Sequence, residues 1–206
     1  MKKMMILFFI ACQACFAGDN KGNGADGILC SDQGHLLDLY ESGFVSPVSN
    51  VTDEKLLLKK MLNDTDSLWE NRNINFTAWI DSFYEEADFV KNSELGEIAD
   101  AGDIKINIPN GCKLVQLVLQ KHIVFGNEKR YLVNYDLWNK LDIFNKAATV
   151  FHEVLYRELN SQNSSRIRSF NSYFFKSYFS NQITLENMIS EFKKLNVPYF
   201  YYYHLP

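Results

Sequence analysis

The chain has 206 residues, of which 47% are apolar and 22% charged, a composition typical of an ordinary globular protein with one or at most two domains. Its formal net charge is −4 at pH 7, and no basic stripe is available for a phosphate backbone, which argues against a nucleic-acid-binding protein. The 16 Phe and 11 Tyr residues supply ample material for a hydrophobic core.

The first residues have the pattern of a secretory signal peptide. Lys2 and Lys3 precede an apolar run, and the small residue Ala17 stands where a signal peptidase cleaves. The run is shorter than the roughly 20 residues that span a bilayer, and no later stretch is long enough either. We therefore expect residues 1–17 to be removed, which leaves residues 18–206 as one domain without a transmembrane span.

This leader predicts a protein that is exported, to the periplasm or beyond the cell, and its form is that of a bacterial signal. Lipidation at Cys12 is the alternative, although Phe9 stands where a lipoprotein signal usually has Leu.

Residues 22–27 read GNGADG, which matches the G-x-G-x-x-G pattern of a dinucleotide-binding turn. That turn needs a strand before the glycines and a helix after them. Here the expected cleavage site leaves no room for the strand, and a short β-type run follows instead of a helix. The pattern therefore predicts a flexible leader that ends in a turn, and it argues against a nucleotide cofactor.

The first half of the expected mature chain mixes short strands with helices. Residues 27–32 and 35–41 are predicted to be two strands around a turn. Thr52 is predicted to be the N-cap of the next helix, and residues 69–89 resume a helical pattern. Apolar and polar residues then alternate over residues 103–108, which predicts a half-buried strand.

A hairpin and a group of helices are predicted to follow. The β-prone run at 112–125 turns at Gly126-Asn127 into a strand that ends at residue 133. From Asn134 to Leu159 apolar residues recur at steps of three and four, which predicts one continuous helix. Further helices are expected from Asn163 and over residues 184–195. These blocks predict an α+β fold, with a small antiparallel sheet and hairpins packed against a C-terminal cluster of amphipathic helices.

The long helix contains FHEVLYRE at residues 151–158, and its His-Glu pair matches the first half of the zinc-peptidase motif H-E-x-x-H. One turn after His152 stands Tyr156, a poor zinc ligand, so the second helical ligand is missing. His152 and Glu153 are therefore candidate catalytic residues, and His152 a candidate metal ligand, of a divergent zinc-dependent hydrolase.

A structural role of the same residues is the favoured interpretation. His152 can stack on Tyr156, and Glu153 can pair with Arg157 one turn later. The next helix carries a polar stripe formed by Ser164, Arg168 and Asn171. If the two helices are antiparallel, Arg168 meets Glu153 in a partly buried pair. A third interpretation places His152, Glu153, Tyr156, Arg168 and Asn171 around a small polar ligand.

Two cysteines remain after the expected cleavage, Cys30 and Cys112. In an exported chain two cysteines are most simply explained by one disulfide, and the alternative is a pair of buried free thiols. Neither has a second cysteine at C-x-x-C spacing, which argues against a redox or zinc-thiolate site.

Several segments together resemble an uncharacterised family of exported bacterial proteins with a C-terminal HExxYRE helix: GNGADGILC, LLDLYE, GCKLVQLVLQ, RYLVNYDLW and FHEVLYRE followed by RSFN. The likeness covers most of the chain after residue 17. It implies the pairing of Cys30 with Cys112 and a central place for the His-Glu helix, and it implies no known activity. Family members often carry a further His after the helix, where this chain has LNSQNSSRIR.

The sequence thus predicts a non-catalytic envelope or secreted protein that binds or supports another molecule and needs no cofactor. The alternative function is a hydrolase that uses zinc at His152 and Glu153.

Overall fold

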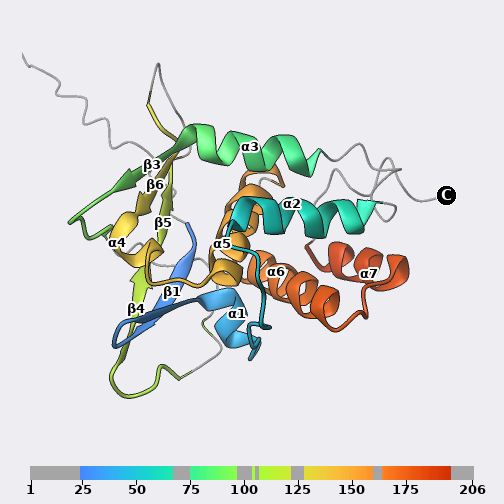
Figure 1. Cartoon of the computed structure of the whole chain (residues 1–206), viewed down its shortest axis with the longest axis horizontal. Coiled ribbons are helices and arrows are strands. Elements are labelled where there is room, and N and C mark those ends of the chain that lie inside the picture. Colours follow the sequence, from blue (N-terminus) through green and yellow to red (C-terminus); the bar gives the residue numbers. More distant parts are fainter. Residues whose placement is uncertain are drawn as a thin grey trace, which may run out of the picture.

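The computed structural model describes residues 24–66, 75–96, 104, 107–121, 128–159 and 164–195. Figure 1 shows the path of the chain, and its elements in order are β1 (Asp26–Cys30), β2 (Gln33–Leu36), α1 (Leu37–Glu41), α2 (Glu54–Asp64), α3 (Phe76–Glu86), β3 (Ala87–Val90), β4 (Cys112–Gln116), β5 (Val118–Gln120), β6 (Tyr131–Asn134), α4 (Tyr135–Trp138), α5 (Ile143–Glu158), α6 (Ser164–Phe179) and α7 (Leu185–Leu195).

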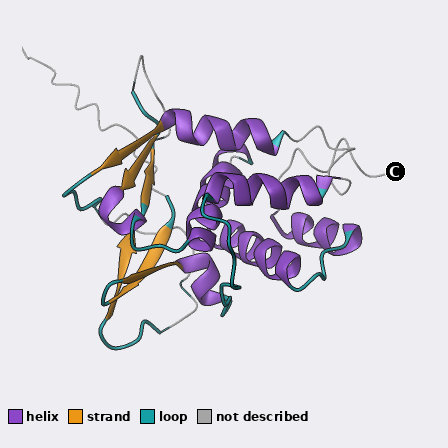
Figure 2. Ribbon diagram, viewed as in Figure 1, coloured by secondary structure: helices purple, strands orange, loops and turns teal. Residues whose placement is uncertain are grey.

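The strands lie on one side of the molecule and most helices on the other, as Figure 2 shows. This arrangement confirms the predicted α+β class and the helices of the C-terminal half. Among the described residues no helix combines the length and the apolar character that a membrane crossing requires.

The first sheet has the order β2-β1-β4, with both pairings antiparallel. The predicted N-terminal hairpin forms, and Ser31 in its turn has a φ of 54°. The predicted second strand, however, ends at Leu36, and residues 37–41 form helix α1. Leu37, Asp38 and Leu39 are all buried. A strand sends successive side chains to opposite faces, whereas one helical turn directs this run of side chains into the core.

The second sheet has the order β3-β6-β5 and mixes the two strand directions. The predicted hairpin is confirmed, since β5 and β6 are antiparallel, and its turn at Gly126-Asn127 lies outside the described residues. β3 runs parallel to β6, which a purely antiparallel prediction did not include. It occupies the end of the predicted helix at 69–89, where the ring of Phe89 packs against Trp138.

The predicted β-prone run at 112–125 is divided between the two sheets. Its first part is β4 and its second part is β5, and the chain changes sheets at Leu117. The N–H groups of Leu117 and Val118 both donate to Ala25 O, at 2.9 and 3.2 Å. This shared acceptor fixes the start of β1 at the point where the two sheets meet.

The predicted helix from Asn134 to Leu159 is two helices. The Asn134 side chain caps only the short helix α4, and Asp142 caps α5. Between them Leu141 forms a β-bridge with Gly34, whose N–H donates to Lys140 O at 3.0 Å. This pairing with the first sheet holds residues 139–142 outside the helical conformation.

Other predicted boundaries shift or fall outside the described residues. Asp53, one residue after the predicted Thr52, caps α2. Ile104 and residues 107–109 are not in a strand, so the strand predicted over 103–108 is wrong in its described part. The leader, the proposed cleavage site, Cys12 and residues 69–74 lie outside the described residues.

Helix α5 is the centre of the core. It packs against α2, α3, α6 and β2, so that helices surround it on several sides (Figure 1). The ring of Phe151 contacts Phe76 of α3 and both Phe170 and Phe174 of α6. This central position buries the His-Glu pair that the sequence places on the same helix.

Candidate functional site

The His-Glu pair of α5 lies inside the protein. His152 is 1% exposed and Glu153 is 0% exposed, and every residue from Ala147 to Tyr156 is buried. α5 is enclosed because its neighbours come from both the sheet side and the helix side. Neither side chain therefore faces an open cleft.

His152 is held by an acidic residue of α1. Its Nδ1 lies 2.8 Å from Asp38 Oδ2, and the same oxygen accepts a hydrogen bond from Asn171 Nδ2 at 2.7 Å. Asn171 Nδ2 also donates to Ala148 O at 2.9 Å, so α1, α5 and α6 meet at one carboxylate. Burial lowers the pKa of His152, but the charge and hydrogen bond of Asp38 outweigh it and raise the pKa to about 9. The imidazole is therefore a cation at neutral pH.

Glu153 connects α5 to the start of the first sheet. Its Oε1 accepts the backbone N–H of Ala25 at 2.5 Å. Burial raises the pKa of Glu153 to about 7, and the charge of His152 and the Ala25 N–H oppose this rise. The carboxyl thus titrates near neutral pH while it holds the first residues of the described chain.

The arginines find other partners than the sequence suggested. Arg157 pairs with Glu86 of α3 at 2.9 Å and with Glu158 at 3.1 Å instead of Glu153. Arg168 pairs with Glu41 of α1 at 3.1 Å instead of Glu153. Glu153 instead accepts the N–H of Ala25, just before β1, while Arg157 reaches Glu86 of α3.

The polar residues predicted on α6 do come together with His152. Asn171 binds the same carboxylate as His152, and Arg168 donates to Ser164 Oγ at 3.0 Å while it also pairs with α1. The ring of Tyr156 is parallel to that of His152, with an interplanar angle of 5° and centroids 6.4 Å apart. We call His152, Glu153, Asp38, Asn171, Arg168 and Glu41 the buried cluster.

Two members of the cluster, Asp38 and Glu41, were missed by sequence reasoning. Both belong to LLDLYE, for which the sequence pattern predicts a strand and which forms α1. An acidic residue between leucines that are themselves buried signals a carboxylate with an internal partner, because an unpaired buried charge is costly. The contact of Glu153 with a backbone N–H had no sequence signal.

In the part of the chain that the structure describes, no group of three His, Cys, Asp or Glu side chains is arranged to hold a metal ion. His152 Nδ1 is engaged by Asp38, and among the described residues Nε2 has no hydrogen-bond partner. A catalytic zinc takes three protein ligands and an open position. The buried cluster offers one imidazole. Its carboxylates already bind groups of other elements: Asp38 binds His152 and Asn171, Glu41 binds Arg168, and Glu153 binds the N–H of Ala25.

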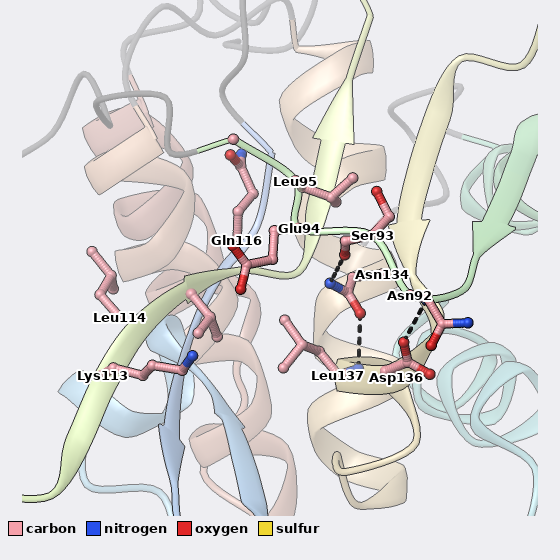
Figure 3. Close-up of a pocket in the computed structure, with 12 residues that line it drawn as sticks. Asn92, Ser93, Glu94, Leu95, Lys113, Leu114, Gln116, Asn134, Asp136 and Leu137 are labelled. Carbon is pink, nitrogen blue, oxygen red and sulfur yellow. Dashed lines mark hydrogen bonds between the residues drawn. The ribbon is translucent and has the colours of Figure 1, made fainter.

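An open pocket lies elsewhere, between the two sheets, as Figure 3 shows. Its volume is about 580 Å³. One wall is β4, over residues 113–116, and the other is formed by residues 92–96 with the start of α4. None of the site residues predicted from the sequence lines it. We call this pocket the β4 groove.

Cys30 and Cys112 lie at disulfide distance, with sulfur atoms 2.03 Å apart, as predicted. They face each other directly across β1 and β4. The bond joins residues separated by 82 positions and closes the end of the sheet beside the β4 groove.

Comparison with known proteins does not supply a relative. No protein-family model matches the chain, and neither the curated proteins nor the solved structures contain a significant match. The contacts of the buried cluster are therefore the structural basis for a functional proposal.

Proposed function

We propose that the chain is an exported, non-catalytic protein that binds or supports another molecule, and that its His-Glu helix is the structural centre of the fold. The observation that carries the proposal is the burial of His152 and Glu153 together with their contacts. His152 is bound to Asp38 of α1, and Glu153 is bound to the backbone at Ala25. Each side chain thus joins α5 to a distant segment.

Export is supported by two features. Residues 1–17 have the charge and apolar pattern of a bacterial signal peptide, and Cys30 and Cys112 lie at disulfide distance. Disulfides persist in oxidising compartments such as the periplasm and the extracellular space. Membership of the exported bacterial family that the sequence resembles belongs to the same proposal, as does the alternative of lipidation at Cys12.

A zinc-dependent hydrolase is the second candidate, and one observation favours it. Asp38 binds Nδ1 of His152, which leaves Nε2 without a hydrogen-bond partner among the described residues. A carboxylate that orients an imidazole in this way is the usual companion of a metal-binding histidine. Zinc would reach Nε2 only if the elements around α5 opened, because the side chain is buried.

Metal content and stability distinguish the two candidates. The mature protein, His152→Gln and the control His35→Gln are each incubated with zinc, desalted and analysed for metal. We expect less than stoichiometric zinc in all three, with a large loss of thermal stability in His152→Gln alone, because only this variant removes the imidazole that pairs with Asp38. His35 is half-buried in β2, and its ring packs against Tyr40.

One zinc ion per chain in the mature protein and in His35→Gln, absent from a folded His152→Gln, would contradict the proposal and support the hydrolase. Hydrolysis of peptide or ester substrates that depends on the same ion would support it further.

A further inference from the structure

A second pocket lies beside α1, where β2 and the start of α5 meet that helix. Its lining comes from β2, from α1, from the loop over residues 43–46 and from the first turn of α5. In Figure 1 β2 leads directly into α1, and both elements contact α5. The volume is about 650 Å³, within the range of sites that bind small molecules. We call it the α1 pocket.

Hydrogen bonds hold the wall of the pocket in place. Asp142, the N-cap of α5, accepts Ser46 Oγ at 2.7 Å and Asn145 Nδ2 at 2.8 Å. Asn145 Oδ1 in turn accepts the N–H of Leu36 at 2.8 Å, which ties α5 to the end of β2. A wall that is fixed before binding reduces the entropy that is lost when a ligand binds.

Aromatic and aliphatic side chains supply the apolar part of the lining. The rings of His35 and Tyr40 contact each other with their centroids 5.6 Å apart, and Phe44 adds a third ring. Leu39 is buried, whereas Val45 is 84% exposed and belongs to the rim. Rings of this kind offer flat apolar faces to a ligand.

Three polar side chains of the α1 pocket have no hydrogen bond to a described residue: Gln33, His35 and Tyr40. An amide, a neutral imidazole and a phenol can each both donate and accept a hydrogen bond. A sugar hydroxyl has the same dual capacity. A carboxylate only accepts and an ammonium group only donates, so neither matches this set as well.

The charges around the pocket also favour an uncharged ligand. Asp142 is the acidic residue of the lining, no Lys or Arg of the described chain belongs to it, and the hydrogen bonds of Asp142 join parts of the fold. The charged side chains next to the lining bind groups outside it: Lys140 binds Asp32, Glu41 binds Arg168, and Lys176 binds Ser42 O.

We propose that the α1 pocket binds a neutral saccharide, with a ring face against the aromatic side chains and hydroxyl groups bonded to His35, Tyr40 and Gln33. The inference rests on the proposed function, because it names the ligand class of a non-catalytic binding protein. One face of a sugar ring carries C–H groups, which pack against aromatic rings, while the hydroxyl groups around the ring need partners that donate and accept.

The probe is a panel of glucose, galactose, mannose, N-acetylglucosamine and N-acetylgalactosamine, together with disaccharides of each. Binding to the mature, oxidised protein is measured by saturation-transfer NMR and calorimetry, with glucose 6-phosphate, glucosamine and a capped tripeptide as charged or non-saccharide comparisons. We expect at least one neutral sugar to bind with a Kd of about 1 mM or lower, and more tightly than these comparisons.

Three variants locate the binding. Tyr40→Phe removes only a hydroxyl group and is expected to weaken binding about fivefold, the loss of one neutral hydrogen bond. His35→Ala removes a ring and a hydrogen-bonding group and is expected to weaken it about tenfold or more. Tyr135→Phe, which makes the same change in α4 outside the pocket, is the matched control and should bind as the unaltered protein does.

Deoxy analogues of the sugar that binds provide a sharper test of the Tyr40 contact. One analogue lacks the hydroxyl group that meets Tyr40. It should bind the unaltered protein more weakly than the parent sugar does, and it should bind Tyr40→Phe about as well as the parent sugar does, because that hydrogen bond is already lost.

The proposal is wrong if no neutral sugar binds, if a charged comparison or the tripeptide binds more tightly, or if Tyr40→Phe and His35→Ala leave the affinity unchanged. If His35→Ala does not fold, Tyr40→Phe and NMR contacts between the sugar and the Tyr40 ring of the unaltered protein decide. Zinc content and the stability of His152→Gln test the proposed function separately, so its failure is distinguishable from failure at the α1 pocket.

Discussion

At the scale of single residues, the buried cluster contains two pairs of opposite charge. Asp38 faces the imidazolium of His152, and Glu41 faces the guanidinium of Arg168. The sequence allowed the stacking of His152 on Tyr156 to be predicted, because both lie on one helix one turn apart. It did not predict Asp38, because that partner lies 114 positions away and in a segment interpreted as a strand.

The two shifted pKa values predict that the protein loses stability as the pH rises. Burial holds the pKa of Glu153 at about 7 in the folded protein, above its ordinary 4.5. Its contribution to the free energy of unfolding is therefore complete below pH 4.5 and is lost as the pH rises through 7. Asp38 holds the pKa of His152 at about 9, above its ordinary 6.5. The contribution of His152 to the free energy of unfolding is therefore complete below pH 6.5 and is lost as the pH rises through 9.

We therefore expect the free energy of unfolding, measured in urea, to be a few kcal/mol lower at pH 9 than at pH 6. The control is His152→Gln/Glu153→Gln, in which most of this dependence disappears. If the free energy of unfolding of the control falls by the same amount between pH 6 and pH 9, groups other than His152 and Glu153 cause the loss.

At the scale of elements, helix caps and hydrophobic periodicity predicted most helices, and contacts from other segments shortened them. α7 begins at Leu185, within one residue of its prediction, because Thr184 and the apolar spacing are local signals. The division of the long helix into α4 and α5 has no local signal of equal strength. It depends on the bridge between Leu141 and Gly34, which are far apart in the chain.

Asp142 is predicted to matter more than an ordinary helix cap. Its Oδ1 accepts both the N–H and the side-chain Nδ2 of Asn145, each at 2.8 Å, and its Oδ2 accepts Ser46 Oγ at 2.7 Å. Asp142→Ala should lower the free energy of unfolding by about 2 kcal/mol, the upper range for a cap. Asp53→Ala, at the exposed cap of α2, is the matched control and should cost less. Equal losses in urea unfolding would show that the additional bonds contribute nothing.

At the scale of the whole molecule, the sequence predicted the α+β class, the β5–β6 hairpin and the pairing of Cys30 with Cys112. Hydrophobic periods and cysteine counting suffice for these features, because they are local or involve the two cysteines that follow the expected cleavage site. The two-sheet arrangement was not predictable, since the division of 112–120 at Leu117 depends on the distant acceptor Ala25 O. The β4 groove was missed for the same reason.

The disulfide is predicted to stabilise the whole fold. It joins residues 82 positions apart, and the chain-entropy model gives a contribution of about 4 kcal/mol for such a loop. Cys30→Ser/Cys112→Ser should lose about this much free energy of unfolding, and a reductant should destabilise the unaltered protein by a similar amount. The reductant should leave the double variant unchanged; a further loss there would point to an effect other than this bond.

The central claim is that His152 is a structural residue bound to Asp38 in the middle of the fold. A double-mutant cycle measures this contact most directly, using urea unfolding at pH 6 of the protein, Asp38→Ala, His152→Ala and the double variant. The account predicts that each single variant loses about 3 kcal/mol or more, and that the double variant loses far less than the sum, with a coupling of about 2 kcal/mol. Additive losses, or a His152→Ala variant as stable as the unaltered protein, would contradict it.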